Sequence, residues 1–311
     1  MARILVTGGA GYIGSILVPE LLGEGHKVTV VDNFMYKQSS LNNICSNNNF
    51  HIINADIRIE ETIKKIVKKF DVIIPLAALV GAPLCNKDPI GATSTNYDAI
   101  CKMLKFISKN QILIMPTTNS AYGSGGEDNF CDENSKLNPI SQYAIEKVKV
   151  EELILNHENS ISLRLATVFG MSPRMRMDLL VNDFVYRAVY DRFVILFESS
   201  FKRNYIHVRD VTKAFIHCIN NYEIMKNQIY NVGLSNANIS KLELCVSIKK
   251  HLKNFVFLES ELSKDPDQRN YIVSNKKIES TGFNPSYGLD DGIIELIKGY
   301  TMIKKTEYGN I

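Results

Sequence analysis

The first half of the chain alternates short apolar runs with longer stretches in which apolar residues recur at helical spacing. The runs read RILVTG, KVTVVDN, NFHIINAD, FDVIIPLAA, ILIMPTT and ISLRLATVFG. Strands that alternate with helices in this way predict βαβ units and a parallel sheet covered by helices on both faces. Because the runs are apolar throughout instead of alternating with polar residues, they are typical of buried parallel strands. The pattern predicts a doubly wound α/β fold with a Rossmann parallel sheet.

The helical stretches and the later part of the chain suggest two domains. YIGSILVPELLGEG has apolar residues at helical spacing and reaches Gly25, which is a typical helix end. In the second half the alternation loosens, which indicates a smaller lobe with one helix that returns to the main sheet. We assign residues 1–168 and about 205–232 to a Rossmann domain, and residues 169–204 and 233–311 to a smaller lobe.

Composition and charge narrow the class of protein. Of the 311 residues, 45% are hydrophobic and 22% are charged, which is ordinary for a globular protein. A net charge of +3 is too small to indicate a nucleic-acid or membrane partner. No apolar run approaches the roughly 18 residues that span a bilayer, and the N-terminus lacks the pattern of a signal peptide. We therefore expect a cytoplasmic protein.

The six cysteines are widely spread and form no C-x-x-C pair. No neighbouring histidine pattern accompanies them, so the spacing predicts no metal site. Buried free thiols are the simplest interpretation, with Cys85 as the one exception that we keep open.

A glycine-rich segment, VTGGAGYIG, places Gly8, Gly11 and Gly14 directly after the first predicted strand and at the start of a helix. Glycines there let the backbone turn tightly, let a pyrophosphate approach and let the helix pack close to the strand, while the helix N-terminus supplies N–H groups. Such a triplet is weak evidence alone. Here the flanking strand and helix are predicted too, and a second strand ends in Asp32, so we predict a dinucleotide site.

Asp32 and two later strand ends extend this site. Asp32 would accept hydrogen bonds from the adenosine ribose hydroxyls and repel a 2′-phosphate, and no arginine follows it directly, so we predict NAD rather than NADP. Asp56 could meet the adenine amino group, or it could instead cap a helix. Ala77 and Ala78 have side chains small enough for a cofactor to lie against, although small residues at a strand end also suit plain packing.

The segment SQYAIEKVK sets Tyr143 and Lys147 four residues apart, on one face of a predicted helix. Tyrosine is a poor base at neutral pH, so a neighbouring ammonium group is needed to favour the phenolate. Moving the pKa of the tyrosine to about 7 takes roughly 4 kcal/mol, which a lysine and a cationic nicotinamide could supply in a dry site. The same spacing also occurs by chance on many helices.

In combination these motifs resemble a known family. The N-terminal TGxxGxxG loop, Asp32, the strand-end segment TTNSAYG and the YxxxK pair are similar to the extended short-chain dehydrogenases/reductases, the NAD-dependent epimerases and dehydratases that modify nucleotide-activated sugars. RNYIHVRDV and DPDQRNYIVSN are similar to later family segments, so the resemblance covers essentially the whole chain. It implies tightly bound NAD and a homodimer formed through two helices per subunit, one of them carrying Tyr143 and Lys147.

The resemblance also assigns catalytic roles. Family members place a catalytic Ser or Thr four residues before the Tyr of a YG pair, which corresponds to Thr118 before Tyr122. Its hydroxyl would hold the sugar hydroxyl that loses a proton to Tyr143, and Lys147 would bind the nicotinamide ribose. The alternative is that the Thr118 hydroxyl only caps the strand end.

The two residues after Thr118 bear on the type of reaction. The 4,6-dehydratases of the family carry an Asp-Glu pair there, whereas this chain has Asn119 and Ser120. Neither side chain is an acid or base near neutral pH, so dehydration is disfavoured. The reductases of the family usually take NADP, and Asp32 argues against NADP. The reaction that remains is oxidation of the sugar at C4, either as a transient step or as the net reaction.

Several basic residues would suit a substrate diphosphate. Arg203 in KRNYIHV and Arg269 in DPDQRNY match the family's phosphate-binding arginines. Arg174 and Arg176 in SPRMRMD lie in a stretch where the resemblance places nucleotide contacts, near Leu179. Guanidinium groups can bind phosphate in bidentate fashion. Solvated surface charge is the alternative for all four.

The remaining predicted contacts lie beside these motifs. Further cofactor contacts are predicted at Tyr12, Ile13, Asn33, Ile57, Leu76, Asn96 and Thr117. On the sugar side we predict Val80 and Asn119, and we expect Val80, Gly81 and Cys85 to face the nicotinamide and the sugar. Thr167 stands where many family members have Asn, which puts one contact in doubt.

Four segments, PLAALVGAPLC, TNSAYG, RLATVFGMSPRMRMDLLVNDF and KRNYIHVRDV, resemble a narrower group, the bacterial GDP-heptose 4-dehydrogenases of capsule sugar synthesis. This resemblance implies oxidation of the C4 hydroxyl of a GDP-sugar, GDP-D-glycero-D-manno-heptose, to its 4-keto form. A nucleotide-sugar 4-epimerase that retains its NADH is the first alternative. A non-catalytic dinucleotide-binding protein is a more distant one, because such proteins tend to lose Tyr143 or Lys147.

Overall fold

A computed structural model of the chain describes residues 1–124, 130–261 and 269–303. Its largest sheet has seven strands in the order β11-β7-β5-β4-β1-β2-β3, and all neighbours are parallel. The strands are β1 (Arg3–Thr7), β2 (Lys27–Asp32), β3 (Phe50–Asn54), β4 (Val72–Pro75), β5 (Ile112–Thr118), β7 (Ser160–Leu165) and β11 (Gln228–Val232). The predicted doubly wound sheet is confirmed. Its order reverses between β1 and β4, which is where sheets of this kind bind ligands.

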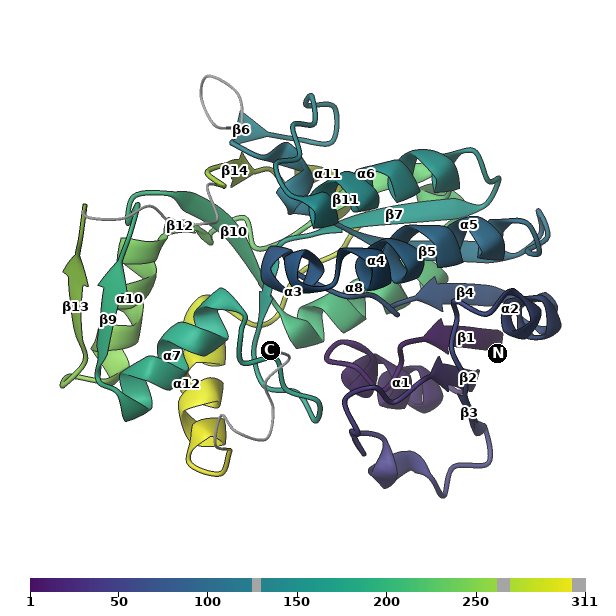
Figure 1. The fold of residues 1–311 in the computed structure, drawn as a ribbon, viewed down its shortest axis with the longest axis horizontal. Helices are drawn as coiled ribbons and strands as arrows, with labels where there is room; N and C mark the ends of the chain where they lie inside the picture. The colour runs from purple at the N-terminus through teal and green to yellow at the C-terminus, as the bar shows by residue number, and fades with distance from the viewer. Residues whose placement is uncertain (125–129, 262–268, 304–311) are drawn as a thin grey trace.

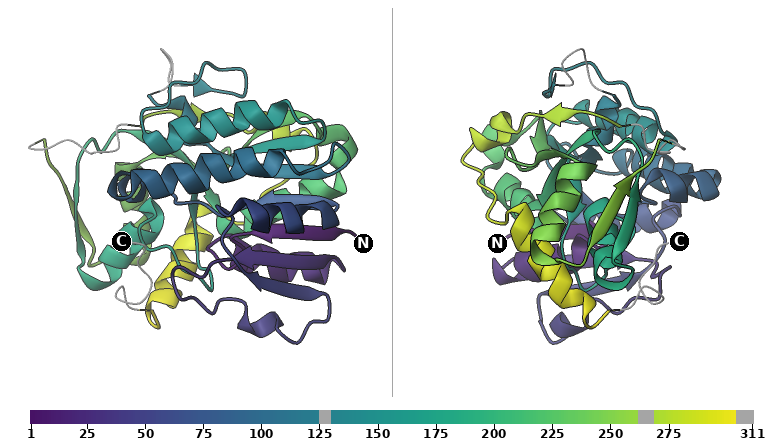
Figure 2. Two further views of the ribbon diagram at one scale, coloured as in Figure 1. Left: turned by 45° about the vertical axis from the view of Figure 1, so that its right-hand side comes forward. Right: turned by 90° about the vertical axis from the view of Figure 1, so that its left-hand side faces the viewer.

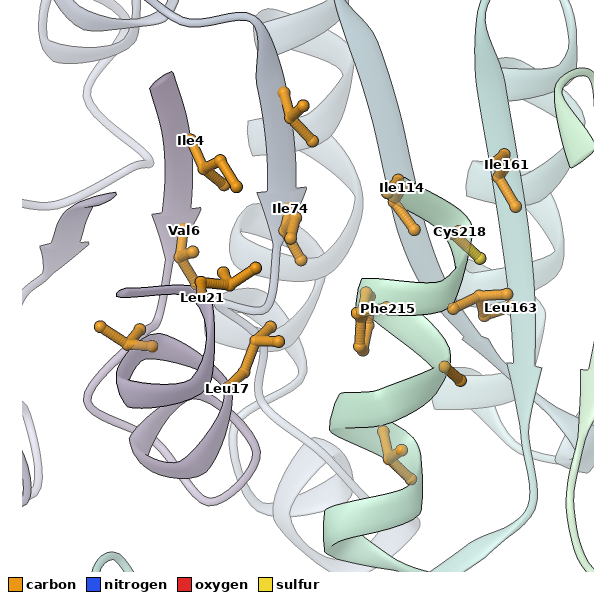
Figure 3. Close-up of a cluster of buried hydrophobic side chains, with 14 of the residues drawn as sticks. Ile4, Val6, Leu17, Leu21, Ile74, Ile114, Ile161, Leu163, Phe215 and Cys218 are labelled. Atoms are coloured by element: carbon orange, nitrogen blue, oxygen red, sulfur yellow. The ribbon is translucent and has the colours of Figure 1, made fainter. Parts of the chain in front are cut away.

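Helices cover both faces of the sheet. Successive residues of each strand point to opposite sides, so the apolar strands present side chains for packing on both faces. Ile4 and Val6 of β1 pack into one cluster, drawn in Figure 3, with Leu17 of the first helix and Phe215 of a later one. Leu5, between them, belongs to a different cluster. The first face is covered by α1 (Gly14–Gly23) and α8 (Val208–Asn220), the second by α2 (Glu60–Ile66), α5 (Ala99–Leu104) and α6 (Gln142–Leu155).

Segments from the second half of the chain build a smaller part with its own core, on the left of Figure 1. Three short strands, β8 (Thr167–Phe169), β10 (Lys202–His207) and β12 (Asn238–Ser240), form one sheet. Two pairs of strands accompany it: β9 (Phe193–Leu196) with β13 (Val256–Glu259), and β14 (Ile272–Val273) with β6 (Phe130–Cys131), which comes from the first half of the chain. The main helices of this part are α7 (Leu180–Tyr190), α10 (Lys241–His251) and α12 (Leu289–Tyr300).

Short helices connect these elements. They are α3 (Ala82–Lys87), α4 (Pro89–Thr93), α9 (Tyr222–Met225) and α11 (Lys276–Glu279), with a π-helical segment at Ser94–Asp98 and 3-10 turns at Asn42–Ile44, Val67–Lys69 and Asn119–Tyr122. Figure 2 shows α4 and α5 running beside α6 along one face of the sheet. Within the described residues, no helix is long and apolar enough to cross a membrane.

The path of the chain between residues 202 and 232 crosses from one part to the other. β10 pairs with β8 and β12 in the smaller sheet, whereas α8 packs on the central sheet and β11 pairs with β7 at its edge. The sequence pattern did not reveal β11 as a separate strand. The division of the chain into 1–168 with about 205–232, and 169–204 with 233–311, stays an interpretation.

Glycine at position 292 allows α12 to pack closely against β8 and β10. A Cβ added at Gly292 would lie 2.2 Å from the Phe169 ring and 3.1 Å from the His207 ring. We expect Gly292→Ala to lower the free energy of unfolding by about 1–3 kcal/mol, because neither buried ring has room to move. Gly23→Ala, where a Cβ meets nothing within 4 Å, should leave it unchanged or raise it by up to about 1 kcal/mol. Urea denaturation of both variants measures this, and equal effects would contradict the packing argument.

Candidate active site

A cavity of about 840 Å³ lies at the carboxyl ends of the central strands. Most of the residues predicted from the sequence line it: Gly8, Gly11, Tyr12, Ile13, Gly14, Asp32, Asn33, Asp56, Ile57, Leu76, Ala77, Ala78, Val80, Thr117, Thr118, Tyr143, Lys147, Arg174, Arg176, Leu179, Arg203 and Arg269. Three residues that we expected at the ligands, Asn96, Asn119 and Cys85, are not on its wall and are each 1% exposed. The fold therefore gathers segments spread over more than 260 residues of sequence around one space.

The glycine loop between β1 and α1 forms a close-fitting floor at one end of the cavity. Gly8 has a φ of 68°, and a Cβ there would lie 2.5 Å from the Cα of Ala77. A Cβ on Gly14 would lie 2.4 Å from the carbonyl oxygen of Gly9. Among the described residues no side chain caps the N-terminus of α1. The N–H groups of Ser15 and Ile16 donate to the backbone oxygens of Gly11 and Ile13, so an anion here would be held by the N–H groups that precede them and by the positive end of the helix dipole. These features fit the pyrophosphate of a dinucleotide.

Asp32 ends β2 at the same edge of the sheet. Its carboxylate accepts hydrogen bonds from the backbone N–H groups of Ala10 (3.0 Å) and Phe34 (2.9 Å), which fix its position. Burial raises the pKa of Asp32, and the two N–H groups and Arg174 oppose that effect. Each carboxylate oxygen keeps a free lone pair. Asp32 can therefore also accept bonds from ribose hydroxyls.

Arg174 and Arg176 lie near each other but have different partners. The Arg174 guanidinium lies 4.6 Å from the centroid of the Tyr36 ring and acts on the pKa of Asp32. Arg176 pairs with Asp178 at 2.5 Å, and its charge acts on Tyr143. Burial raises the pKa of Tyr36 and both guanidinium groups oppose this effect, while burial and the charge of Arg176 lower the pKa of Arg174. The two arginines therefore form one positive region of the cavity wall that reaches towards Asp32 through Arg174 and towards Tyr143 through Arg176.

Asp56 lines the cavity but is already engaged by another side chain. Arg58 donates to it from Nε at 3.0 Å and from Nη2 at 2.5 Å, and this bonding lowers the pKa of Asp56. The alternative role of a helix cap does not apply, because α2 begins at Glu60 and its N-cap residue is Ile59. Any contact of Asp56 with an adenine would be made by the Asp56–Arg58 pair together.

Tyr143 and Lys147 project from α6, whose first turn is capped by Ser141. Lys147 is 4% exposed, and its Nζ donates to the carbonyl oxygen of Pro116 at 3.1 Å, on β5. Burial lowers the pKa of Lys147 to about 8. It raises the pKa of Tyr143 to about 12, and the cations that oppose this effect are Arg176 and Arg269.

Thr118 ends β5 with its hydroxyl at the cavity. Its Oγ1 accepts a hydrogen bond from the Ser120 N–H at 3.1 Å and donates to Ser120 Oγ at 3.0 Å, so the hydroxyl does cap the strand end. Ser120 Oγ also accepts a hydrogen bond from Arg269. The capping bonds and the cavity position coexist, so capping does not exclude a substrate contact by Thr118.

Three residues that we expected beside the cofactor or sugar lie behind the cavity wall. The Asn96 side-chain amide forms hydrogen bonds with the backbone of Leu79. The Cys85 thiol, 1% exposed, donates to the Leu79 carbonyl oxygen at 3.3 Å. Burial raises the pKa of Cys85 to about 11, so the thiol is not a reactive one. Asn119 is buried, and its amide meets no partner within the described part of the chain. The expectation that Cys85 faces the ligands is wrong, because α3 turns its side chain inward.

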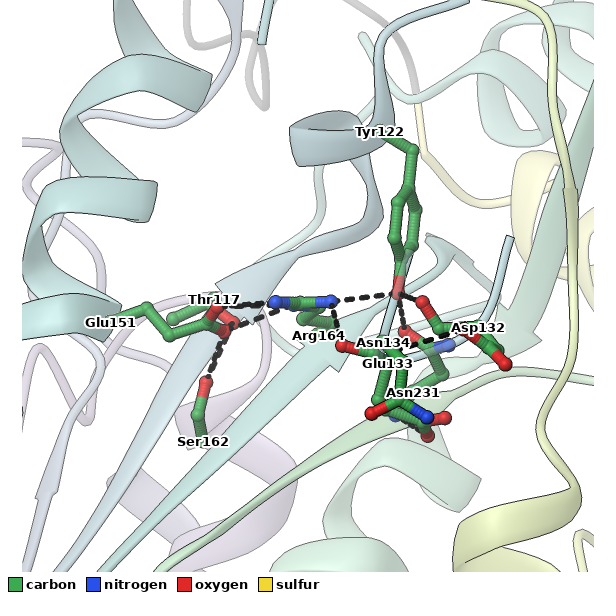
Figure 4. A network of polar contacts seen from close by, with 9 residues as sticks. All are labelled: Thr117, Tyr122, Asp132, Glu133, Asn134, Glu151, Ser162, Arg164 and Asn231. Atoms are coloured by element: carbon green, nitrogen blue, oxygen red, sulfur yellow. Dashed lines mark hydrogen bonds and ion pairs between the residues drawn. The ribbon is translucent and has the colours of Figure 1, made fainter. Parts of the chain in front are cut away.

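A buried ionic network that the sequence analysis missed joins α6 to the central sheet (Figure 4). The Glu151 carboxylate accepts hydrogen bonds from Arg164 Nη2 at 2.6 Å, Ser162 Oγ at 2.7 Å and Thr117 Oγ1 at 3.0 Å. Arg164 continues to the Tyr122 hydroxyl at 2.9 Å. The sequence feature that could have pointed to this network is the four-residue spacing of Tyr143, Lys147 and Glu151, which places Glu151 on the same helix face as the other two.

Comparison with known proteins identifies the class to which this fold and site belong. Residues 4–233 match the profile of the NAD dependent epimerase/dehydratase family. The chain belongs to that family, and its cofactor is NAD.

Individual relatives agree with this assignment. A Methanocaldococcus jannaschii protein provisionally named UDP-glucose 4-epimerase is 28% identical over 94% of this chain and 97% of its own length. A Bacillus cytotoxicus UDP-N-acetyl-alpha-D-glucosaminuronate decarboxylase is 26% identical over 97% of this chain and 98% of its own length. The Bacillus cereus UDP-glucuronic acid 4-epimerase, solved with UDP-glucuronic acid and NAD, shares the fold with a TM-score of 0.84 at 22% identity, covering 96% of this chain and 99% of that one.

Removing the carboxylate of Glu151 would leave the Arg164 guanidinium buried without its ion pair. We expect Glu151→Gln to lower the free energy of unfolding by about 3–5 kcal/mol. Glu152→Gln, one residue along the same helix but exposed, should change it by less than about 0.5 kcal/mol. Urea denaturation compares the two variants, and a small effect of Glu151→Gln would show that the network contributes little to stability.

The buried ammonium of Lys147 should destabilise the cofactor-free protein near neutral pH. Its pKa falls from 10.5 to about 8 on folding, so the unfolded chain binds the proton more tightly and stability rises with pH between these values. We expect Lys147→Met to raise the free energy of unfolding at pH 7 by roughly 2–3 kcal/mol, and this gain to shrink towards pH 9.5. Lys149→Met, at an exposed position of α6, is the matched control. A loss of stability in Lys147→Met at pH 7 would overturn this account.

Proposed function

We propose that this protein oxidises the C4 hydroxyl of a nucleotide-activated sugar, with a GDP-linked heptose as the first candidate substrate. The observation that carries the proposal is the gathering of Thr118, Tyr143 and Lys147 at one end of the cavity whose other end holds the glycine loop and Asp32. NAD, when bound, supplies the acceptor for the hydride that leaves C4.

The side chains of this chain would perform the rest of the reaction. The Thr118 hydroxyl, fixed by Ser120, would orient the C4 hydroxyl, and Tyr143 would accept its proton. The positive charges of Arg176 and Arg269 favour the ionised form of Tyr143 against the effect of burial. Lys147, held by the Pro116 carbonyl, would bind a ribose hydroxyl of the cofactor.

The environment of Thr118 supports oxidation without loss of water. Elimination of water from the sugar needs one group to remove a proton and another to donate one. At the positions where family dehydratases carry such a pair, this chain has Asn119, whose amide cannot titrate, and Ser120, whose hydroxyl is bonded to Thr118 and Arg269. Dehydration is therefore not part of the proposed reaction.

The diphosphate of the substrate would be bound by arginines of the smaller part. Arg203 on β10 and Arg269 before β14 both line the cavity, and Arg203 is 4% exposed. Their guanidinium groups can bind phosphate oxygens in bidentate fashion. The choice of GDP and heptose rests on the resemblance of four sequence segments, and the homodimer stays a prediction.

A 4-epimerase acting on a UDP-sugar is the second candidate, favoured by the names of the relatives and of the Bacillus cereus enzyme. A ketone at C4 is common to both reactions. In an epimerase the keto sugar turns over and takes the hydride back on its other face, whereas in net oxidation it leaves. The same residues serve both, so the product distinguishes them.

The mass of the sugar nucleotide recovered after incubation with purified protein and NAD decides between these reactions. GDP-heptose and a panel of UDP-sugars are the substrates to compare. We expect a loss of two hydrogens with one substrate, and a fall in turnover of at least about a hundredfold in Tyr143→Phe, because the proton acceptor is gone. Unchanged mass with a changed sugar proton spectrum would establish the epimerase instead. Full turnover by Tyr143→Phe would contradict the assigned role of Tyr143.

A further inference from the structure

A buried carboxylate that the chemistry above does not use lies directly behind the cavity wall. Glu146 stands on α6, one residue before Lys147, and is 2% exposed. It accepts hydrogen bonds from Thr93 Oγ1 at 2.5 Å, Gln142 Nε2 at 3.0 Å and Asn96 Nδ2 at 3.2 Å. An ionised carboxylate only accepts hydrogen bonds, so three neutral donors suit it and fill most of its lone-pair sites.

Asn96 connects this carboxylate to the backbone of the wall. It lies in the π-helical segment Ser94–Asp98, a distortion that is common at functional sites. Its Oδ1 accepts from the Leu79 N–H at 2.9 Å, and its Nδ2 donates to the Leu79 carbonyl oxygen at 3.0 Å. The second proton of Nδ2 points to Glu146, so Glu146 fixes the orientation of the amide. Without that acceptor, a buried N–H group would lose its partner.

The peptide held in this way belongs to the part of the cavity that carries Tyr143. Leu79 follows Ala77 and Ala78 at the end of β4 and lines the cavity, and its side chain packs in one cluster with Cys85, Ala92 and the ring of Tyr143. The glycine loop and Asp32 occupy the opposite end and suit the pyrophosphate and the adenosine. The nicotinamide end of NAD therefore falls against the wall that includes Leu79.

We propose that Glu146 is a positioning residue of the cofactor site: through Asn96 it holds the Leu79 peptide in the orientation that forms the wall for the nicotinamide ring. Glu146 touches neither cofactor nor substrate and acts only through its neighbours. Its removal should loosen one end of the site and leave the adenosine end intact.

The charge of Glu146 supports the same arrangement. Burial lowers the pKa of Lys147 to about 8, and Cys85 and Glu146 oppose this effect. Burial keeps the Cys85 thiol protonated in this pH range, so the opposing charge is that of the Glu146 carboxylate. Lys147 is held from the strand side by the Pro116 carbonyl oxygen. A neutral side chain at position 146 would remove the charge that favours the ammonium form of Lys147.

A comparison of two ligands tests the proposal, because ADP-ribose has every part of NAD⁺ except the nicotinamide ring. Calorimetry would measure the dissociation constants of NAD⁺ and ADP-ribose for the wild type, Glu146→Gln and Asn96→Ala. We expect both variants to bind NAD⁺ at least about tenfold more weakly while ADP-ribose affinity stays within about twofold. A general loss of structure would weaken both ligands alike, so the ratio of the two constants reports the positioning role.

Glu152→Gln is the matched control, because it makes the same chemical change at an exposed position of α6 and should alter neither constant. Equal weakening of both ligands in Glu146→Gln and Asn96→Ala, or unchanged NAD⁺ binding in both, would overturn the proposal. If Glu146→Gln does not fold, the ratio measured with Asn96→Ala decides. No sugar nucleotide is present, so failure here is separate from failure of the proposed oxidation.

Discussion

The buried ion pair between Glu151 and Arg164 is the interaction on which the arrangement of the site depends. It joins α6 to β7, and the same carboxylate binds Thr117, next to the strand-end Thr118. Glu151 lies on the helix face that also carries Tyr143 and Lys147. The three side chains that the proposed reaction requires thus stand on two elements held together by one carboxylate. Charges buried at 4% exposure are costly, so their bonds must be complete, and complete bonding allows little movement.

Close contact between loops plays the same role on the other side of the cavity. The positive φ of Gly8 and the absence of a Cβ let its loop touch the backbone of Ala77 after β4. Two residues later, the peptide of Leu79 is clamped by Asn96. The segment after β4 is therefore fixed from the glycine loop at one end and from the helices at the other. Because this wall is already fixed before an extended ligand binds, the ligand does not have to order it. The entropic cost of binding is therefore lower.

Local patterns in the sequence predicted the sheet and the glycine loop, and the resemblance to a known family supplied much of the remaining cavity lining, such as Thr118 and Arg269. Apolar runs determine strands, and glycine spacing determines the loop that follows β1. The network of Glu151 and Arg164 and the clamp of Asn96 on Leu79 could not be predicted, because each depends on contacts between distant segments. Asn96 was expected at the cofactor, but a π-helical segment turns its amide onto the backbone of Leu79. Arg174 and Arg176 look equivalent in sequence, and their different partners, the Tyr36 ring and Asp178, are set only when the loop after β8 is folded.

The ionisation of Tyr143 shows how the two parts of the molecule cooperate. Burial raises the pKa of Tyr143 and lowers that of Lys147, so it opposes the charged form of both side chains on α6. The cations that act in the opposite direction on Tyr143 are Arg176, from the loop after β8, and Arg269, which precedes β14. Both come from segments outside the central sheet, and both line the cavity. The acidity of Tyr143 therefore depends on the position of the smaller part, and in the proposed reaction these arginines would help the proton acceptor to ionise where the substrate is held.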